Sequence, residues 1–407
     1  MCAIDLDFGG KAREEVMEYV INEHGRDNVC ALGTYQYVWG KGVVRDIGKV
    51  LGIPLEETDK IAKKIDGSLD FKEVMELGII DSYKEQYPEL FQYCEKLSGL
   101  PKSFGIHSCG RVISNYPIMS LSAVDLSEEM PTLMLDMHEA EDLGMVKFDF
   151  LGVRTIDVIY DTLEMIGKTY DYIAPHNIDF EDKNVWNNFK NGNTNGVFQF
   201  SSDGMKSTLT KMGADNMETL IAANALYRPG SMAYIQNYID RKNGEEEITY
   251  IHDDLKPILN VTYGIITYQE QLIEVGRLAG LENPDKLRKA TAKKNPKLMA
   301  EVKPELKKGL LNRGWTEEAV EELWDIMVEF SKYSFNKSHS AGYSILAYQT
   351  MYLKTYHPYE FMASWINSEE GDLKKLRECY SEAKSLGLRV EKPTWRNIGG
   401  LTRIVSL

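Results

Sequence analysis

Long apolar runs, cysteine pairs and internal repeats are all missing from this 407-residue chain. No run of about 18 apolar residues occurs, so the sequence predicts no membrane-spanning helix and no membrane partner. The first residues have neither the basic start nor the apolar stretch of a signal peptide. The five cysteines form no CxxC pair, which favours a reduced, cytoplasmic compartment over an oxidising one.

Positive charge is also scarce. The chain has 47 Lys and Arg against 62 Asp and Glu, and this net charge of −15 argues at face value against nucleic acid as a partner. One segment differs, because residues 285–308 carry nine basic and three acidic side chains, a local charge of +6. Such a segment can hold a polyphosphate, although its ordinary alternative is a solvated helix face.

The pattern of apolar residues predicts an α+β fold that is mostly helical. Strands are predicted at residues 1–8, 105–115 and 145–150, and a helix at about 12–24. Residues 54–100 look helical, and the chain beyond about residue 183 reads as helices separated by Asn-Gly and Pro-Gly breaks. The length suffices for about two to four domains with cores of their own.

Two aspartates stand near the start of the chain. Asp5 and Asp7 are two residues apart on a predicted strand, so both side chains point to one face, while Leu6 points the other way, toward a core. Two neighbouring carboxylates repel each other unless a cation lies between them, and Mg²⁺ prefers such oxygen ligands. The alternative is that these aspartates are turn residues or helix caps.

A third aspartate, Asp149, lies in another short apolar run, and Lys147 shares its face. Three carboxylates would hold two ions about 4 Å apart, an arrangement that stabilises the attacking and leaving oxygens in phosphoryl transfer. The separation along the chain does not show whether Asp149 lies near Asp5 and Asp7 in the fold.

Longer strings resemble the C-family DNA polymerases, the family of the bacterial DNA polymerase III alpha subunit. Ile4–Phe8 is similar to the family's DIDxDF segment, and Lys147–Thr155 is similar to its KFDFLGLRT segment. The resemblance continues in order to about residue 395, through Gly196–Phe200, Asn224–Gly230, Tyr263–Gln271 and Phe335–Ala341. The family's HxGGxVI pattern appears as His107–Ile113, where Cys109 and Arg111 are departures.

The resemblance implies a set of site residues. Asp5, Asp7 and Asp149 would be the catalytic aspartates that bind two Mg²⁺ ions. The residues expected to bind the incoming nucleotide are Lys147, Arg288, Lys289, Tyr333, Lys337 and His339. Lys293 and Lys294 would bind DNA or phosphate. Taken by itself, His339 is predicted to be a polar residue whose hydrogen bonds are satisfied within the protein. Gln269 and Glu270 are predicted to be structural residues that fix loops.

The resemblance also implies a domain order. Residues 1–36 and 105–165 would be parts of a polymerase-beta-like nucleotidyltransferase palm, 37–104 a helical thumb, 166–395 helical fingers, and 396–407 a truncated tail. The family's PHP domain and the front of its palm have no counterpart in the sequence.

The implied function is template-directed DNA synthesis, in which a DNA-directed DNA polymerase adds deoxynucleotides to a primer 3′-hydroxyl. The implied partners are primer–template DNA, deoxynucleoside triphosphates and a second polypeptide carrying the N-terminal palm and PHP region. A sliding clamp would bind only through another chain. The alternative is a catalytically inactive DNA-binding or regulatory remnant of a polymerase.

Overall fold

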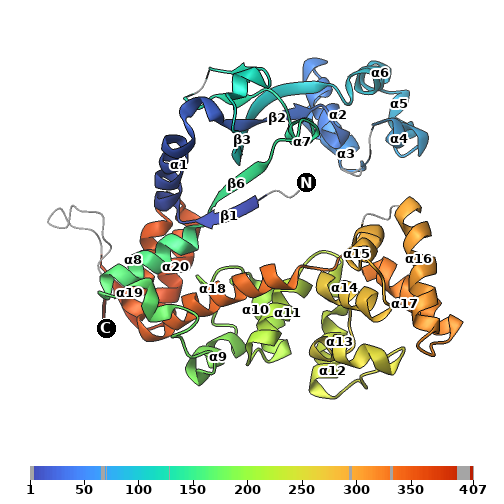
Figure 1. The fold of residues 1–407 in the computed structure, drawn as a ribbon. Helices are drawn as coiled ribbons and strands as arrows, with labels where there is room; N and C mark the ends of the chain where they lie inside the picture. Colours follow the sequence, from blue (N-terminus) through green and yellow to red (C-terminus); the bar gives the residue numbers. More distant parts are fainter. Residues whose placement is uncertain are drawn as a thin grey trace. The chain divides into compact units, whose positions relative to one another are not determined.

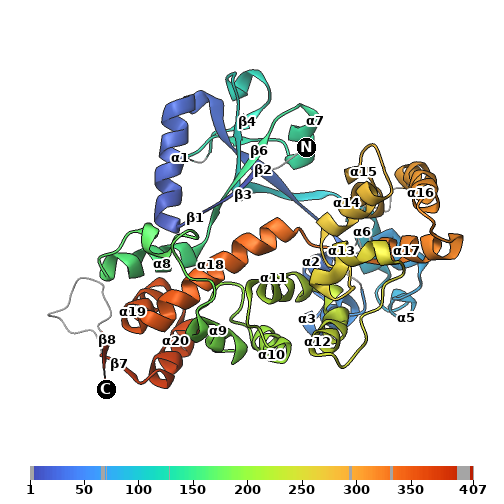
Figure 2. The ribbon, with the colours of Figure 1, turned by 60° about the horizontal axis from the view of Figure 1, so that its bottom comes forward.

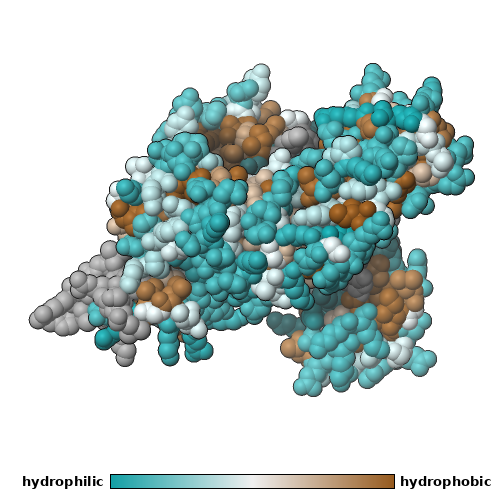
Figure 3. Space-filling view, turned by 90° about the horizontal axis from the view of Figure 1, so that it is seen from below, coloured by the Kyte–Doolittle hydropathy of each residue, from teal (hydrophilic) through white to brown (hydrophobic). Residues whose placement is uncertain are grey.

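The chain folds into two compact units, Met1–Val153 and Arg154–Leu407 (Figure 1). This computed structural model describes residues 4–65, 69, 71–127, 129–292, 296–330, 333–391 and 404–406. In these ranges, no helix is both long enough and apolar enough to span a membrane. The face drawn in Figure 3 is mostly hydrophilic and is interrupted by separate apolar patches.

A mixed six-stranded sheet organises the first unit. Its strands lie in the order β1-β6-β3-β2-β5-β4, and β1 pairs with β6 in parallel. The strands are β1 Ile4–Phe8, β2 Val29–Tyr37, β3 Pro101–Ile113, β4 Val124–Asp125, β5 Thr132–Leu133 and β6 Lys147–Gly152. The three predicted strands are therefore confirmed as β1, β3 and β6.

Helix α1 (Gly10–His24) covers one face of this sheet. Its Met17 and Val20 are buried with Phe150 of β6, and Phe8 of β1 stacks on Phe150 with ring centroids 5.9 Å apart. The expectation that Leu6 faces a core is wrong, because Leu6 is 39% exposed. Strand β1 is an edge strand of the described sheet, and the apolar cluster under α1 does not extend to Leu6.

A helical subdomain is inserted between β2 and β3. It buries its own apolar cluster, in which Phe71 and Phe91 stack with centroids 6.4 Å apart. Its helices are α2 Gly40–Val50, α3 Leu55–Ala62, α4 Phe71–Glu76, α5 Asp81–Lys84 and α6 Pro88–Leu97. The short elements η1 Arg26–Asn28, η2 Ile118–Ser120 and α7 Met137–Asp142 complete the first unit.

The second unit is helical apart from one small hairpin of β7 (Leu388–Val390) and β8 (Ile404–Ser406). Its α-helices are α8 Arg154–Met165, α9 Lys183–Lys190, α10 Asp203–Met212, α11 Met217–Leu226, α12 Ile235–Asn243, α13 Lys256–Leu259, α14 Gln269–Leu278, α15 Asp285–Ala292, α16 Pro296–Leu311, α17 Glu317–Phe330, α18 Lys337–Tyr356, α19 Pro358–Ser368 and α20 Leu373–Ser385. Its 3₁₀ turns are η3 Tyr170–Ile173, η4 Ser231–Tyr234, η5 Asp253–Leu255 and η6 Asn260–Thr262.

Helix α18 is central to the second unit, where α8, α9, α11 and α19 surround it (Figure 2). Its Tyr348 is fully buried, with Trp186 and Phe180 each at a ring-centroid distance of 5.0 Å. Helix α8 buries one face, including Leu163, in the core of the second unit, and the compact units divide just before it, after Val153.

A buried ion pair ties α18 to α20. Lys354 Nζ lies 2.5 Å from Glu382 Oε1 and also donates to the carbonyl oxygens of Asn193 and Asn195, both at 2.9 Å. Both side chains of the pair are less than a tenth exposed. Burial lowers the pKa of Lys354, and Glu382 opposes that effect.

We predict that Lys354→Met lowers the free energy of unfolding by about 3–5 kcal/mol, because it leaves Glu382 buried without a cation. Urea denaturation followed by circular dichroism measures the loss. The control is Lys206→Met, which removes a pair with the exposed Asp203 and should cost at most about 1 kcal/mol. Equal losses in the two variants would contradict the importance of the buried pair.

Candidate active site

A bulge in β3 shapes the centre of the first sheet. Ala31 of β2 pairs with Arg111 of β3, and Gly33 pairs with Ile106. From one pair to the next, the chain moves two residues along β2 but five residues along β3. Residues 107–110 of β3 thus stand against the single residue Leu32 of β2, and Gly110 pairs with Asp149 of β6 on the other side. Bulges of this kind re-aim side chains that a regular strand would point elsewhere.

The strand register brings the predicted carboxylates together. Asp5 of β1 is the direct partner of Asp149 of β6, and Asp7 is the partner of Leu151. Paired residues point to the same face of a sheet, as do residues two apart along a strand. Asp5, Asp7 and Asp149 therefore share one face, opposite the face that α1 covers. Asp5 and Asp7 are exposed, whereas Asp149 is 9% exposed.

Three side chains surround the Asp149 carboxylate. Lys147 Nζ lies 2.9 Å from Oδ2, so its ammonium neutralises one side of the carboxylate. Cys109 Sγ lies 3.6 Å from Oδ1, and His107 Nδ1 lies 3.8 Å from the same oxygen. The two oxygens of Asp149 thus have different neighbours: a cation on one, and a thiol and an imidazole on the other.

Gly110 allows this crowding. A Cβ atom at Gly110 would lie 2.8 Å from His107 Nδ1 and 3.1 Å from Cε of Lys147. Its backbone N–H donates to His107 Nδ1 at 2.7 Å, which makes Nδ1 the acceptor and places the ring hydrogen of the neutral imidazole on Nε2. Burial, and then the charge of Lys147, lower the pKa of His107. Burial raises the pKa of the Cys109 thiol.

A second group of predicted residues gathers at the start of α18 in the second unit. Asn336 caps this helix by accepting from His339 N at 2.7 Å, and the exposed His339 ring packs edge-on against Phe335 at 5.3 Å. Lys337 Nζ is paired with Glu218 at 3.0 Å. Tyr333 precedes the helix and is 38% exposed; its ring lies over Gly230, where a Cβ would be 2.1 Å from it.

Acids from outside the basic segment 285–308 offset part of its charge. Arg288 and Lys289 on α15 lie 2.6 and 2.8 Å from the two oxygens of Asp285, whose pKa they lower. In the described part of the segment, the basic residues in ion pairs include Lys286, Arg288, Lys289, Lys303 and Lys307. Lys293 and Lys294 lie outside the described residues. Asp285 and Glu301 are already counted in the local charge of +6, so Glu317 and Glu321, which pair with Lys307 and Lys303, lower it to +4.

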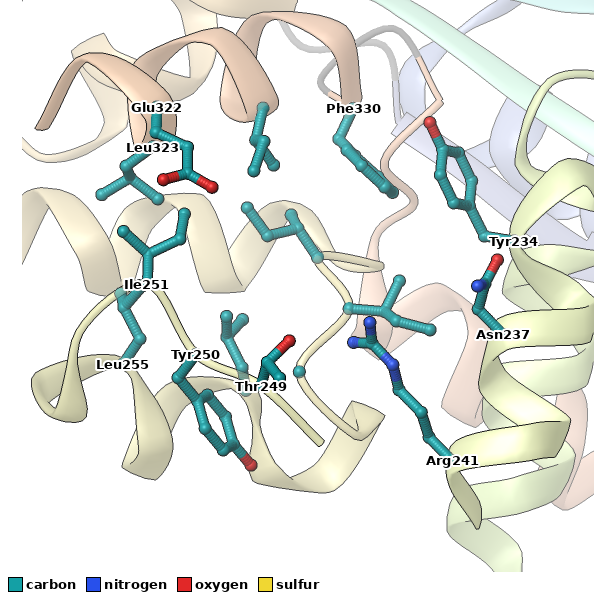
Figure 4. Close-up of a pocket in the computed structure, with 15 residues that line it drawn as sticks. Tyr234, Asn237, Arg241, Thr249, Tyr250, Ile251, Leu255, Glu322, Leu323 and Phe330 are labelled. Atoms are coloured by element: carbon teal, nitrogen blue, oxygen red, sulfur yellow. The ribbon is translucent and has the colours of Figure 1, made fainter. Parts of the chain in front are cut away.

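A cavity of about 540 Å³ lies elsewhere in the second unit, beside α12 and α17. Figure 4 shows Arg241 pointing into it from α12 and Glu322 from α17. The Arg241 guanidinium is already paired with Glu246 at 2.8 Å. None of the site residues predicted from the sequence lines this cavity.

Comparison with known proteins assigns the family. Residues 1–152 match the family model of the bacterial DNA polymerase III alpha NTPase domain, and residues 155–314 match that of the bacterial DNA polymerase III alpha subunit finger domain. The chain belongs to the DNA polymerase III alpha subunit family. The two matched regions meet where the two compact units divide.

The curated relatives of this family are much longer than the chain. It is 36% identical over 410 residues to DNA polymerase III subunit alpha of Campylobacter jejuni, covering 96% of this chain and 34% of that protein. The same subunit of Treponema pallidum is 38% identical, with 96% and 34% covered, and that of Escherichia coli is 35% identical, with 96% and 36% covered. The chain thus spans about a third of these relatives.

Sequence reasoning missed two residues that lie beside Asp149. His107 and Cys109 were noted only within a family pattern, yet both lie against Asp149. Cys109 stands two residues from His107, and this spacing was the only available signal. The bulge that turns both side chains toward β6 depends on strand pairing, which spacing along the chain does not reveal.

Glu270 acts as an anchor for α18, which agrees with the structural interpretation of this residue. Its carboxylate accepts from the backbone N–H of Lys337 at 2.9 Å and from that of Ser338 at 3.4 Å. An anion at a helix N-terminus stabilises the helix dipole and satisfies N–H groups that have no partner within the helix.

We predict that Glu270→Ala lowers the free energy of unfolding by about 1–2 kcal/mol, since it removes this anchor. The control is Glu274→Ala on the same helix, which removes only an exposed pair with Arg277 and should cost less than about 0.5 kcal/mol. Chemical denaturation measures both values. A loss from Glu274→Ala as large as that from Glu270→Ala would refute the anchoring role.

Proposed function

We propose that the chain carries the metal-binding carboxylates and the nucleotide-binding fingers of a DNA polymerase, which adds deoxynucleotides to a primer 3′-hydroxyl. The observation that carries the proposal is the shared face of Asp5, Asp7 and Asp149 on adjacent strands. The names of the relatives support it, since each is a DNA polymerase III subunit alpha.

The carboxylates fit Mg²⁺. Like charges directly opposite each other on neighbouring strands are destabilising, and Lys147 offsets only one of the three negative charges. A hard divalent cation with oxygen ligands would remove the remaining repulsion. Asp5, Asp7 and Oδ1 of Asp149 would hold two Mg²⁺ ions, which supply charge stabilisation of the attacking and leaving oxygens.

The other residues of the chain would position the reactants. In the reaction the primer hydroxyl oxygen forms a bond to the α-phosphorus, and the bond from that phosphorus to the bridging oxygen breaks as pyrophosphate leaves. Lys147 is held against Asp149, so its charge stands at the edge of the carboxylate face, where it would meet the triphosphate. Arg288, Lys289 and Lys337 would exchange their present carboxylate partners for phosphate oxygens.

His339 and Tyr333 would form the sugar pocket together with the start of α18. Both rings are exposed and are held by neighbours: His339 by Phe335, and Tyr333 by its contact with Gly230. Aromatic side chains fixed in this way offer a flat surface at low entropic cost. Lys293 and Lys294 are proposed to bind DNA phosphates.

A further palm segment is proposed to pair with β1. This strand is at the edge of the described sheet, and its Ile4 and Leu6 are 41% and 39% exposed. An open edge with exposed apolar side chains favours pairing with another strand. The relatives are about three times as long as the matched region, so the rest of a longer palm, in the same protein or in a second polypeptide, is a suitable source.

We predict that Asp7→Asn lowers the rate of nucleotide addition at least about 100-fold, because it removes a metal ligand. The fold should be unchanged, since Asp7 is exposed. The measurement is Mg²⁺-dependent primer extension in the presence of a polypeptide carrying the N-terminal palm region, with Asp27→Asn, an exposed acid of the same unit, as the matched control. Activity of Asp7→Asn within a few-fold of the parent would refute the metal assignment.

We also predict that primer extension requires both this chain and a polypeptide carrying the N-terminal palm region. If primers are extended only when both polypeptides are present, the chain is part of a polymerase and not the second candidate, an inactive DNA-binding remnant. The pairing of Lys303 and Lys307 with Glu321 and Glu317 supports that second candidate, because these two cations are already bound to acids. Binding of primer–template DNA without extension in any combination would establish the remnant, and extension by the chain alone would refute the need for a partner.

A further inference from the structure

Three different ligand atoms meet at one point of the carboxylate face. Cys109 Sγ lies 3.6 Å from Asp149 Oδ1, His107 Nδ1 lies 3.7 Å from Cys109 Sγ, and His107 Nδ1 lies 3.8 Å from Asp149 Oδ1. These atoms form a nearly equilateral triangle. In the described ranges, this is the group of histidine, cysteine and acid side chains that comes together closely enough to hold a metal ion.

The triangle has almost the size that a tetrahedral zinc ion requires. Zinc binds sulfur at about 2.3 Å and nitrogen or oxygen at about 2.0–2.2 Å, so two of its ligands lie about 3.4–3.6 Å apart at the tetrahedral angle. The observed edges exceed these values by only a few tenths of an ångström. Small rotations of the Cys109 and His107 side chains would close the difference.

We propose that His107, Cys109 and Asp149 form a binding site for a thiophilic divalent cation, Zn²⁺, which takes the oxygen of Asp149 that faces away from Lys147. A soft thiolate and an imidazole favour zinc and disfavour magnesium, which prefers oxygen ligands. The site is thus chemically distinct from the proposed Mg²⁺ sites, although it shares one carboxylate with them.

The surroundings of Asp149 suit a dication. Lys147 holds Oδ2 and leaves Oδ1 directed toward the thiol and the imidazole. When the cation binds, Cys109 releases its proton to solvent and becomes a thiolate. Asp149 and the thiolate then supply two negative charges as ligands, and these match the two positive charges of Zn²⁺.

His107 presents a lone pair to the site. Its Nδ1 accepts from Gly110 N–H at 2.7 Å, so that nitrogen carries no hydrogen in the neutral ring. A metal at Nδ1 would replace this hydrogen bond and a longer one from Cys109 N–H at 3.4 Å. The fourth position of the tetrahedron would be filled by water or by Asp5, the register partner of Asp149.

Occupancy by zinc would have a functional consequence. The ion would remove Asp149 Oδ1 from the Mg²⁺ sites, so zinc should inhibit nucleotide addition in competition with magnesium. This part of the inference rests on the proposed function, whereas zinc binding itself does not. A glycine at position 109, which the family pattern has there, would lack the sulfur ligand.

The binding test uses the whole reduced chain, freed of metal, with Co²⁺ as an optical probe. One equivalent of Co²⁺ should produce a thiolate-to-cobalt charge-transfer band in the near ultraviolet. One equivalent of Zn²⁺ should abolish the band, and a large excess of Mg²⁺ should not. A parent chain that develops no such band overturns the zinc site.

Matched variants identify the ligands. Cys109→Ser and His107→Gln should each bind Zn²⁺ at least about tenfold more weakly in competition with a chelator dye, a free-energy difference of about 1.4 kcal/mol or more. The controls Cys2→Ser, a cysteine outside the described residues, and His176→Gln, an exposed histidine paired with Asp171, should bind as the parent does. A band that persists in Cys109→Ser or disappears in Cys2→Ser overturns the assignment.

An assay on the parent chain needs no variant to fold. Zn²⁺ should protect Cys109 from alkylation by a maleimide, as measured by mass spectrometry of the peptide that contains Cys109. Equal modification with and without zinc would overturn the site.

In primer extension, Zn²⁺ inhibition should weaken at least about tenfold in Cys109→Gly relative to the parent. The titrations use no DNA or nucleotide, so their failure overturns the zinc site alone, and failure of primer extension overturns the proposed function alone.

Discussion

Repulsion between neighbouring carboxylates is the constraint on which the first unit depends. Asp5 and Asp149 are direct partners on parallel strands, and Asp7 follows on the same face. Like charges directly opposite each other on neighbouring strands weaken the pairing of those strands. The register survives because the opposite face is apolar: Phe8 stacks on Phe150, and α1 covers both strands. One face of the pairing thus provides the stability that allows the other to concentrate negative charge.

Glycine determines how the charged face is completed. Gly110 lies directly beside Asp149 in the sheet, and its lack of a side chain leaves room for the His107 ring and the stem of Lys147. The bulge at 107–110 then brings an imidazole and a thiol to a carboxylate that would otherwise meet only the ammonium group. A single residue, Cys109, gives this part of the family's sheet a ligand that differs in chemistry from the carboxylates around it.

The second unit handles charge differently. Its basic residues are distributed over helices and paired with acids on the same or the next helix, as in the pairs of α15 and those between α16 and α17. A deeply buried pair, Lys354 and Glu382, joins two helices of the core, where an unpaired charge would be costly. The start of α18 combines a capping asparagine, an anchoring glutamate and exposed aromatic rings. The start of α18 is therefore held in place by hydrogen bonds while its aromatic rings stay exposed.

The sequence by itself determined the α+β class, the strands β1, β3 and β6, the helical character of the chain beyond residue 183, and the family. These features depend on local periodicity and on strings of neighbouring residues, and both can be read directly from the sequence. Only the tertiary structure decided that Asp149 lies opposite Asp5, that Leu6 is exposed, and that Lys303 and Lys307 of the basic segment pair with Glu321 and Glu317. It also decided that His107 and Cys109 meet Asp149. Strand register, edge position and ion pairing between helices join residues far apart in the chain, so no spacing in the sequence could reveal them.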